Sequence, residues 1–339
     1  MSVENPVRTA VIGAGSFGTC LAILLAEGGH DVALWARDPA VALAIQRQRR
    51  NPRYLSEFRL PEGVRATDSL EEALAEREIA LSVVPSHGVR EVWSKGAAWL
   101  GETALVVSGS KGIEVGTGKL VHQILEDVLP PRARERVVVL SGPSFAREIA
   151  EGRPTALSVA ARADGFAIAV QSLLSSPRLR CYSTTDVIGV ELGGALKNVI
   201  ALAVGAVDGM QLGQNARAAV ITRGLAEITR LGVALGADPM TFLGLSGLGD
   251  LVLTCTGDLS RNRRVGFEIG QGRSLDDVLA GLHQVAEGVR TAKSAWELAQ
   301  AHGVEMPITE TVYRVLYEGR DPRDAVREVM ARQLRPETE

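Results

Sequence analysis

The sequence predicts an α/β protein in which a doubly wound parallel sheet is followed by an all-helical domain. Apolar, β-prone runs alternate with helical stretches over residues 1–186, whereas residues 187–330 show helical periodicity and few β-rich runs. A glycine-rich turn at residues 13–18 joins the first predicted strand to the first helix. Alternation of this kind favours right-handed crossovers and a largely parallel sheet.

The first predicted strand, residues 9–12, runs directly into the turn Gly13-Ala14-Gly15-Ser16-Phe17-Gly18, and an apolar helical stretch follows. In such a turn Gly13 allows the sharp bend, Gly15 lets the backbone approach phosphates, and Gly18 lets the helix pack on the strand. The helix N-terminus then faces the pyrophosphate of a dinucleotide. The motif alone is weak in a chain with 36 glycines, and a plain strand–helix turn is the alternative. Its place between strand and helix favours a Rossmann-like dinucleotide site.

The second predicted strand, residues 31–36, ends at Arg37-Asp38-Pro39. An acidic residue at this point usually binds the ribose 2′-hydroxyl of NAD, whereas an arginine suits the 2′-phosphate of NADP. Because Arg37 precedes Asp38, we expect Arg37 to stack on the adenine and pair with the 2′-phosphate, which favours NADP(H). A solvated turn arginine is the alternative.

The other predicted strands of this domain are mostly apolar throughout, which is typical of strands covered on both faces. They are residues 79–84, 104–108, 137–140 and 155–160. Helical stretches alternate with the strands at residues 19–27, 40–48, 89–99, 119–128 and 166–174. Residues 1–186 are therefore predicted to form an NAD(P)-binding domain whose ligand lies at the carboxyl edge of the sheet.

The pattern becomes helical from residue 187 onward. Helices are expected at residues 187–207, 216–235, 275–282, 291–302 and 307–316, with Gly/Ser/Arg-rich loops at 244–249 and 254–264. We expect residues 187–330 to form a helical substrate and catalytic domain, followed by a polar tail at residues 331–339.

Composition narrows the classes of function. The 339-residue chain has a formal net charge of −3 and 4% aromatic residues, which gives no reason to expect nucleic acid or an anionic membrane as a partner. The three cysteines form no CxxC pair and the five histidines lack ligand spacing, so neither a disulfide framework nor a metal site is expected. The N-terminus lacks signal-peptide features, and charged residues interrupt the apolar run at residues 187–207. A soluble, cytoplasmic protein without an integral membrane segment is expected.

Two polar, glycine-flanked segments follow predicted strands. Lys111 lies in Gly109-Ser110-Lys111-Gly112, and the segment Ser141-Gly142-Pro143-Ser144 follows the strand at residues 137–140. Both segments should face the ligand, because they leave the carboxyl ends of strands. Ser144 is interpreted either as the N-cap of the next helix or as part of a turn whose amides bind a phosphate or cofactor group.

The helix expected at residues 187–207 carries Gly193, Gly194 and Lys197. Helical side chains lean toward the N-terminus, so Lys197 should lie over the two glycines. Each glycine in a helix interior costs about 1 kcal/mol relative to alanine, so the pair is interpreted as room for a ligand beneath the lysine. The alternative is tight helix packing with Lys197 directed to solvent.

The two predicted loops of the second domain add charged groups. Asp250 follows Gly247-Leu248-Gly249, and Ser260-Arg261-Asn262-Arg263-Arg264 concentrates three guanidiniums with hydroxyl and amide donors. The planar fork of arginine matches a phosphate dianion, so this second segment is interpreted as an anion clamp. A solvated basic loop is the alternative.

In this order, these segments resemble the bacterial NAD(P)-dependent glycerol-3-phosphate dehydrogenase family. The resemblance runs over nearly the whole chain and is carried by VIGAGSFGT, VSGSKGIE, LSGPSFARE, ELGGALKNV, GLGDLVLTC, SRNRRVG and VAEGVRT. It implies reversible reduction of dihydroxyacetone phosphate to sn-glycerol 3-phosphate with NADP(H) or NAD(H), which supplies glycerophospholipid synthesis in the cytoplasm. A homodimer is expected from base rates alone.

The same resemblance implies the site residues. Lys197 would be the proton acceptor, with Lys111 and Asp250 as the other catalytic groups. The cofactor would contact Gly13, Gly15, Ser16, Phe17, Gly18, Arg37, Lys111, Ala146, Arg261, Val285 and Glu287. The substrate would be surrounded by Lys111, Gly142, Ser144, Lys197, Asp250, Ser260, Arg261 and Asn262. For proton transfer near pH 7, burial and Lys111 must lower the pKa of Lys197, and Asp250 would partly oppose that shift.

Two other functions are weighed against this one. A two-domain reductase of the hydroxyacid or ketopantoate type also has a glycine turn and a helical domain with a lysine. Its carboxylate substrate does not call for so dense a cationic cluster as residues 260–264. A redox-sensing NAD(P)-binding protein without turnover needs no proton-transfer groups, and Lys111, Lys197 and Asp250 argue against it.

Overall fold

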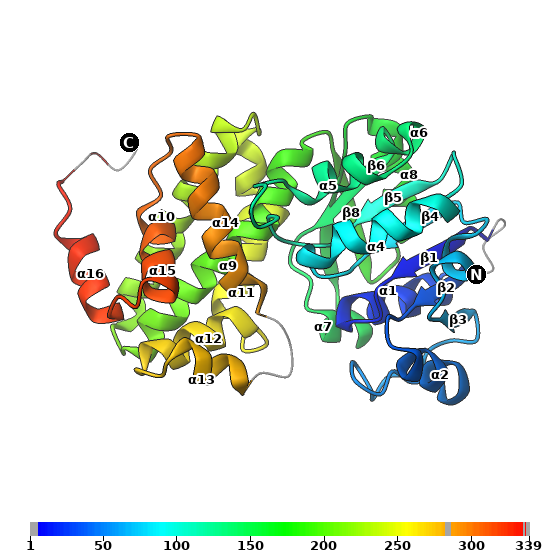
Figure 1. Cartoon of the computed structure of the whole chain (residues 1–339), viewed down its shortest axis with the longest axis horizontal. Helices are drawn as coiled ribbons and strands as arrows, with labels where there is room; N and C mark the ends of the chain where they lie inside the picture. Colours follow the sequence, from blue (N-terminus) through cyan, green and yellow to red (C-terminus); the bar gives the residue numbers. More distant parts are fainter. Residues whose placement is uncertain (1–5, 282–285, 335, 337–339) are drawn as a thin grey trace.

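The computed structural model describes residues 6–281, 286–334 and 336, and it places a sheet-containing half beside a helical half (Figure 1). The sheet extends from Arg8 to Thr184, and the long helix α9 (Val187–Gly209) begins the helical half directly afterwards. The change in pattern near residue 186 therefore coincides with the change from strands to helices.

Eight strands form one sheet in the order β3-β2-β1-β4-β5-β6-β7-β8. Every neighbouring pair is parallel except β6 and β7, which run antiparallel. The strand order reverses between β1 and β4, and doubly wound sheets bind ligands at the carboxyl ends beside such a reversal. The strands are β1 (Arg8–Ile12), β2 (Asp31–Trp35), β3 (Val64–Thr67), β4 (Ile79–Ser82), β5 (Leu105–Ser108), β6 (Val137–Ser141), β7 (Thr155–Ala161) and β8 (Leu179–Thr184).

Helices cover both faces of the sheet, as continuously apolar strands require. In β1, Val11 belongs to one hydrophobic core, while Ala10 and Ile12 belong to the core on the opposite face. The first core includes α1 (Ser16–Glu27), α2 (Pro39–Gln48) and α8 (Asp164–Leu174). The second includes α3 (Leu70–Leu74), α4 (Val89–Gly96), α5 (Val121–Val128) and α6 (Pro131–Arg134).

The sequence pattern does not predict the two edge strands, β3 and β8. In β8, Leu179 and Cys181 are buried whereas Arg180 and Tyr182 are exposed, because an edge strand is covered on one face only. The short β3 has only one fully buried residue, Val64. Alternating or very short strands lack the continuous apolar run by which the central strands are recognised.

Helix α9 forms the core of the helical half, where α10, α11, α12, α14 and α15 pack around it. By length and composition it could cross a bilayer, but its most apolar window is 89% buried inside the protein. The other helices are α10 (Gly213–Ala234), α11 (Asp250–Thr256), α12 (Arg261–Gly270), α13 (Leu275–Ala280), α14 (Glu287–Ala301), α15 (Pro307–Tyr317) and α16 (Pro322–Met330).

The two segments predicted as loops in this half are largely helical. Residues 245–249 form a π-helical turn that leads into α11, so Asp250 is the first residue of a helix. The segment around Arg261 starts α12, and the Ser260 hydroxyl accepts a hydrogen bond from the Arg263 amide as the helix N-cap. Two of the glycines that suggested loops allow close packing instead, because a Cβ on Gly247 would lie 2.1 Å from the Phe242 carbonyl oxygen and one on Gly257 would lie 2.6 Å from the Phe145 ring.

Helices α9 and α12 cross with their backbones in contact, because glycines line both faces. A Cβ on Gly205 would lie 2.0 Å from the Arg263 carbonyl oxygen, and one on Gly266 would lie 2.0 Å from the Leu202 carbonyl oxygen. Such a contact leaves no space for a methyl group, so the backbones would have to separate. The crossing fixes the start of α12 relative to α9.

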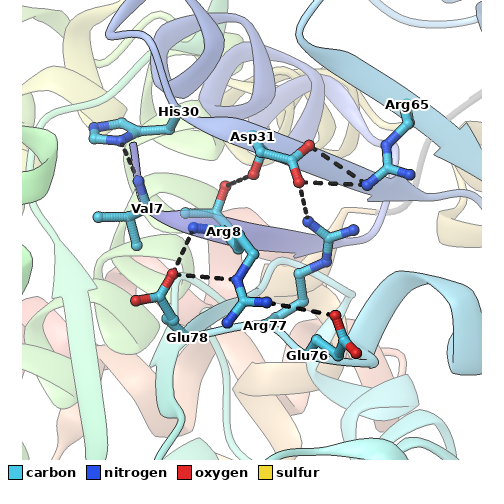
Figure 2. Close-up of polar contacts among 9 residues, drawn as sticks. Val7, Arg8, His30, Asp31, Arg65, Glu76, Arg77 and Glu78 are labelled. Carbon is cyan, nitrogen blue, oxygen red and sulfur yellow. Dashed lines mark hydrogen bonds and ion pairs between the residues drawn. The ribbon is translucent and has the colours of Figure 1, made fainter. Parts of the chain in front are cut away.

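Ion pairs join the amino ends of the strands, at the edge opposite the ligand edge (Figure 2). Asp31 at the start of β2 pairs with Arg65 at 3.3 Å and with the buried Arg77 at 2.8 Å, while Arg8 pairs with Glu78 at 3.5 Å. The two exposed pairs, Asp31–Arg65 and Arg8–Glu78, contribute at most about 1 kcal/mol each. The cluster therefore ties strand ends together without occupying the functional edge.

We expect Gly205→Ala to lower the free energy of unfolding by about 3 kcal/mol, because its methyl group would collide with the Arg263 carbonyl. The measurement is urea denaturation. Gly165→Ala is the matched control, because nothing lies within 4 Å of the Cβ added at this position in α8. A loss at Gly205 no larger than at Gly165 would show that the helix crossing tolerates separation.

Candidate active site

The glycine turn has the geometry that a dinucleotide site needs. Gly13 has φ +120°, and a Cβ there would lie 2.8 Å from the Val83 carbonyl oxygen. A Cβ on Gly18 would lie 1.8 Å from the Gly13 carbonyl oxygen, so this glycine allows the close start of α1. Gly15 has nothing within 4 Å of its Cβ position, which leaves the backbone open to an approaching phosphate. The residues therefore fit a pyrophosphate at the N-terminus of α1.

Phe17 follows Ser16 in the first turn of α1. A Cβ on Gly109 would lie 3.1 Å from the Phe17 ring, so the glycine after β5 provides the space in which this ring packs. Ser16 is the first residue of α1, and Ala146 is the first residue of α7 (Ala146–Ala150), which packs against α1. Three residues assigned to the cofactor by resemblance therefore lie on two helices in contact.

The charged centre of the site joins the two halves of the protein. Lys111, which follows β5, donates to Asp250 at 2.7 Å and to the Gly142 carbonyl at 3.3 Å. Lys197, from the middle of α9, donates to the other carboxylate oxygen of Asp250. Asp250 is only 1% exposed, and the Lys197 side chain is 10% exposed. Three residues far apart in sequence thus form one buried cluster of two ammonium groups and one carboxylate.

This environment lowers the pKa of Lys197 to about 8. Burial is the largest cause, because removing an ammonium group from water disfavours its charged form. The charge of Lys111 lowers the pKa further, whereas Asp250 raises it and keeps the shift moderate. An amine with a pKa near 8 can both accept and donate a proton at neutral pH.

The interpretation of Gly193 and Gly194 as room for a ligand is wrong. A Cβ on Gly193 would lie 2.4 Å from the Ser246 carbonyl oxygen, and one on Gly194 would lie 2.4 Å from the Ser141 hydroxyl. The glycines therefore let α9 pack closely on the π-helical turn and on the end of β6. Lys197 nevertheless points to Asp250 and not to solvent, so the alternative interpretation is only half correct.

Ser144 does not cap a helix, contrary to one of the two interpretations. Helix α7 begins at Ala146 with Phe145 as its N-cap, and no side chain caps it. The Ser144 hydroxyl donates to the Gly142 carbonyl at 2.8 Å, the same oxygen that accepts from Lys111. Gly142 has φ +129°, a conformation that L side chains rarely adopt. The turn after β6 therefore positions the Lys111 ammonium.

Two of the three arginines in the predicted clamp have carboxylate partners within the helical half. Arg263 pairs with the largely buried Asp208 at 2.9 Å, and Arg264 pairs with Glu268 at 3.3 Å. Arg261, the first residue of α12, lies close enough to Glu287 to stabilise its charge. The start of α12 therefore presents Arg261 together with the backbone amides that a helix N-terminus leaves without intrahelical partners.

Asn262 joins three helices. Its Nδ2 donates to Asn198 Oδ1 at 2.9 Å, and its Oδ1 accepts from the Gly288 amide at 3.0 Å. Asn198 follows Lys197 on α9, and Gly288 lies in the first turn of α14. The sequence did not single out Asn198, because a polar residue beside a lysine carries no distinctive pattern.

Glu287, the first residue of α14, is half-buried beside the loop after β4. Burial raises its pKa, while Arg261, the Ser86 amide and the two site lysines oppose that rise. Its carboxylate therefore lies within the field of the same cations that surround Asp250. Val285, also assigned to the cofactor by resemblance, lies outside the described residues.

Comparison with known proteins identifies the family. Residues 8–167 match the family profile of the NAD-dependent glycerol-3-phosphate dehydrogenase N-terminus, and residues 186–327 match that of its C-terminus. The chain belongs to the NAD-dependent glycerol-3-phosphate dehydrogenase family.

Relatives of this glycerol-3-phosphate dehydrogenase family match over almost their full length. The chain is 52% identical to glycerol-3-phosphate dehydrogenase [NAD(P)+] of Geobacter sp. (strain M21), with 97% of this chain and 98% of the relative covered. It is 52% identical to the Myxococcus xanthus protein of that name, with 98% and 99% covered. A Coxiella burnetii glycerol-3-phosphate dehydrogenase structure matches with a TM-score of 0.91 at 39% identity, covering 96% of this chain and 99% of that one.

The ketopantoate reductases that the sequence left as an alternative share the fold. A Ralstonia eutropha ketopantoate reductase matches with a TM-score of 0.59 at 16% identity, over 94% of this chain and 100% of that one. At this identity the likeness concerns the fold alone. The two family profiles and the more similar relatives assign the chain to the glycerol-3-phosphate dehydrogenases and not to the ketopantoate reductases.

A buried pair of histidine and glutamate fixes α9 to the sheet half of this glycerol-3-phosphate dehydrogenase family member. Sequence analysis missed this pair. Glu191 accepts from the backbone amide of His122 at 2.9 Å and contacts its ring at 2.5 Å. Burial opposes a charge on His122, but the hydrogen bond and charge of Glu191 outweigh it and raise the His122 pKa. The pair joins α5 to α9 two turns before Lys197.

We expect His122→Gln to lower stability most at and below about pH 6.5, the ordinary histidine pKa. Because the folded-state pKa is raised, the ion pair stabilises the fold below the unfolded pKa, and this contribution is lost as pH rises through the folded pKa. Urea denaturation of both proteins between about pH 5.5 and 8.5 measures the difference.

The control for this measurement is His302→Gln, which removes an exposed histidine after α14. Its effect on the free energy of unfolding should be small at each pH. A stability difference for His122→Gln that is constant across the pH range would show that His122 acts through packing and not through its charge.

Proposed function

We propose that this protein catalyses the reversible, NAD(P)H-dependent reduction of dihydroxyacetone phosphate to sn-glycerol 3-phosphate. The observation that carries the proposal is the buried cluster of Lys197, Asp250 and Lys111 at the carboxyl edge of a dinucleotide-binding sheet. With this activity the enzyme would supply sn-glycerol 3-phosphate for glycerophospholipid synthesis in the cytoplasm. Homodimer formation is proposed from base rates only.

When bound, the nicotinamide cofactor supplies the hydride that is exchanged with C2 of the substrate. The chain's own residues then have three tasks: holding the dinucleotide, moving one proton at the C2 oxygen, and orienting the phosphate. The open backbone at Gly15 and the start of α1 support the first task. The residues assigned to the cofactor also include Arg37, Ala146, Arg261 and Glu287.

Lys197 is assigned the proton transfer. Reduction of the ketone requires a donor at the C2 oxygen, and oxidation of the alcohol requires an acceptor there. A lysine with a pKa of about 8 serves both directions. Asp250 orients the ammonium of Lys197 through its hydrogen bond. Lys111 adds a second positive charge, which stabilises negative charge developing on the C2 oxygen.

The substrate phosphate is assigned to the start of α12. Ser260, Arg261 and Asn262 lie there, and the helix N-terminus favours an anion. Asn262 donates one Nδ2 hydrogen to Asn198 and accepts a hydrogen bond from the Gly288 amide, so its side-chain amide is fixed. An amide nitrogen carries two hydrogens, and the second one is assigned to the phosphate. Phosphate held by a rigid helix start would orient C2 toward Lys197.

The direct test is the loss of NADPH or NADH absorbance when dihydroxyacetone phosphate is added to the purified protein. Ketopantoate in place of dihydroxyacetone phosphate tests the alternative reductase. No turnover with either substrate would favour a binding protein without catalysis.

We expect kcat for glycerol 3-phosphate oxidation to rise with pH through a midpoint near 8, because the neutral amine of Lys197 accepts the proton. The reduction rate should fall through the same midpoint, since it needs the ammonium form. Lys197→Met should lower kcat by a factor on the order of 10²–10⁴ and remove this titration. The measurement is the pH profile of kcat in both directions.

Lys111→Met provides the second arm of this experiment. Because the charge of Lys111 lowers the Lys197 pKa, the variant's oxidation midpoint should move to higher pH. Near-normal turnover of Lys197→Met with an intact fold would remove Lys197 as the acid–base group.

We expect Arg261→Ala to lower kcat/KM for dihydroxyacetone phosphate at least about tenfold more than for unphosphorylated dihydroxyacetone. The physical reason is the loss of a charge-assisted contact that only the phosphorylated substrate can make. Arg264→Ala is the matched control, because Arg264 pairs with Glu268 one turn further along α12. An equal loss for both substrates in Arg261→Ala would show that this arginine does not bind the phosphate.

A further inference from the structure

The segment between α2 and β3, residues 49–60, is bonded directly to the glycine turn. Asn51 is fully buried, and its Nδ2 donates to the Ala14 carbonyl at 2.9 Å and to the Thr19 hydroxyl at 2.8 Å. Its Oδ1 accepts from the amides of Arg53 and Tyr54 at 3.0 and 3.1 Å. Both polar atoms of this side chain are thus used to hold the segment against the dinucleotide turn.

Other contacts make the segment a defined structure. Arg50 donates to the Ser56 carbonyl at 2.9 Å and to the Glu57 carbonyl at 2.7 Å. Glu57 pairs with Arg147 of α7 at 3.3 Å. In Figure 1 the segment follows α2 and extends toward α7. The backbone of the segment is therefore held at a fixed place beside the cofactor site.

The segment places Arg53 at the carboxyl end of β2. Arg53 forms an ion pair with Asp38, the residue after Arg37. Asp38 is the N-cap of α2, and its Oδ1 accepts from the Ala40 amide at 2.9 Å. The Ala40 hydrogen bond and the charge of Arg53 hold the Asp38 pKa below its ordinary value, so Asp38 is ionised at neutral pH.

Arg37 lies on the other side of the same strand end. The positive charge of Arg37 lowers the pKa of Glu91, which lies in α4, and of His87, which precedes α4. Arg53 reaches the strand end from the side of α2. Two guanidiniums therefore flank the position where doubly wound folds bind the 2′ substituent of the adenosine ribose.

We propose that Arg53 supplies the second positive charge of the 2′-phosphate site, and so contributes to the choice of NADP(H) over NAD(H). This inference rests on the proposed use of NAD(P)H. A 2′-phosphate would bring about two negative charges beside the ionised Asp38, and Arg37 alone does not balance both anions. The Arg53 side chain is 59% exposed and its pair with Asp38 is a surface pair, so it can turn toward a phosphate at little cost.

The test compares two cofactor fragments, 2′,5′-ADP and 5′-AMP, by isothermal titration calorimetry with the full chain. The fragments differ only in the 2′-phosphate, and their binding requires no turnover. Arg53→Ala should raise the Kd for 2′,5′-ADP about tenfold and leave the Kd for 5′-AMP within about twofold. Arg53→Lys, which keeps the charge, should recover part of the loss.

Two further variants make the test specific. Arg59→Ala removes another exposed arginine from the same segment and should leave both Kd values within about twofold. Asp38→Asn keeps a good N-cap but removes the carboxylate charge, so it should tighten 2′,5′-ADP alone. An equal change for both fragments in Arg53→Ala, or no change, overturns the proposal.

The same variant separates this inference from the proposed function. Arg53→Ala should keep turnover with NADH and dihydroxyacetone phosphate while its kcat/KM for NADPH falls about tenfold. Turnover with an unchanged NADPH preference would defeat the role of Arg53 and leave the reaction intact. Absence of turnover in the wild type would defeat the proposed function, while the fragment titration would still decide the role of Arg53.

Discussion

The candidate active site depends on one buried carboxylate that is shared by two ammonium groups. Asp250 contacts both Lys111 and Lys197, and it is almost completely removed from water. Buried charges are costly unless they are paired and hydrogen-bonded, and one carboxylate cannot neutralise two ammonium groups. Burial lowers the pKa of Lys197 to about 8, Lys111 lowers it further and Asp250 opposes the shift, while the unequal charges leave the cluster with a net positive charge. The proposed proton transfer and the proposed attraction of an anionic substrate therefore both depend on these buried ammonium groups.

The cluster exists because backbones approach one another closely around α9. Gly193 and Gly194 bring this helix onto the turn before Asp250 and onto the end of β6, near Lys111. Further along, Gly205 brings α12 against α9, which places the proposed phosphate site relative to Lys197. Contacts between backbones are less adaptable than contacts between side chains, because no rotamer change can relieve a collision. Glycines thus fix the positions of Lys197, Asp250 and the start of α12 relative to one another.

Sequence analysis recovered the features that have a strong local signal. Continuous apolar strands, the glycine turn and the family motifs led to the fold and the enzyme class. It missed β8, because an edge strand alternates, and it mistook the start of α12 for a loop. The pairs Glu191–His122 and Asn198–Asn262 join residues more than 60 positions apart. No single segment carries a pattern for such contacts, so only the folded chain shows them.

Two of the three arginines at the start of α12 already have carboxylate partners, which bears on the proposed phosphate site. Arg263 and Arg264 are held by Asp208 and Glu268, which leaves the proposed contact to Arg261, the amide of Asn262 and the helix start. Binding that is equally strong in the ground state and the transition state does not speed the chemical step. A rigid helix start with a single arginine favours orientation over total charge. In the proposed reaction, such a site would direct C2 toward Lys197 without binding either phosphorylated compound too tightly for release.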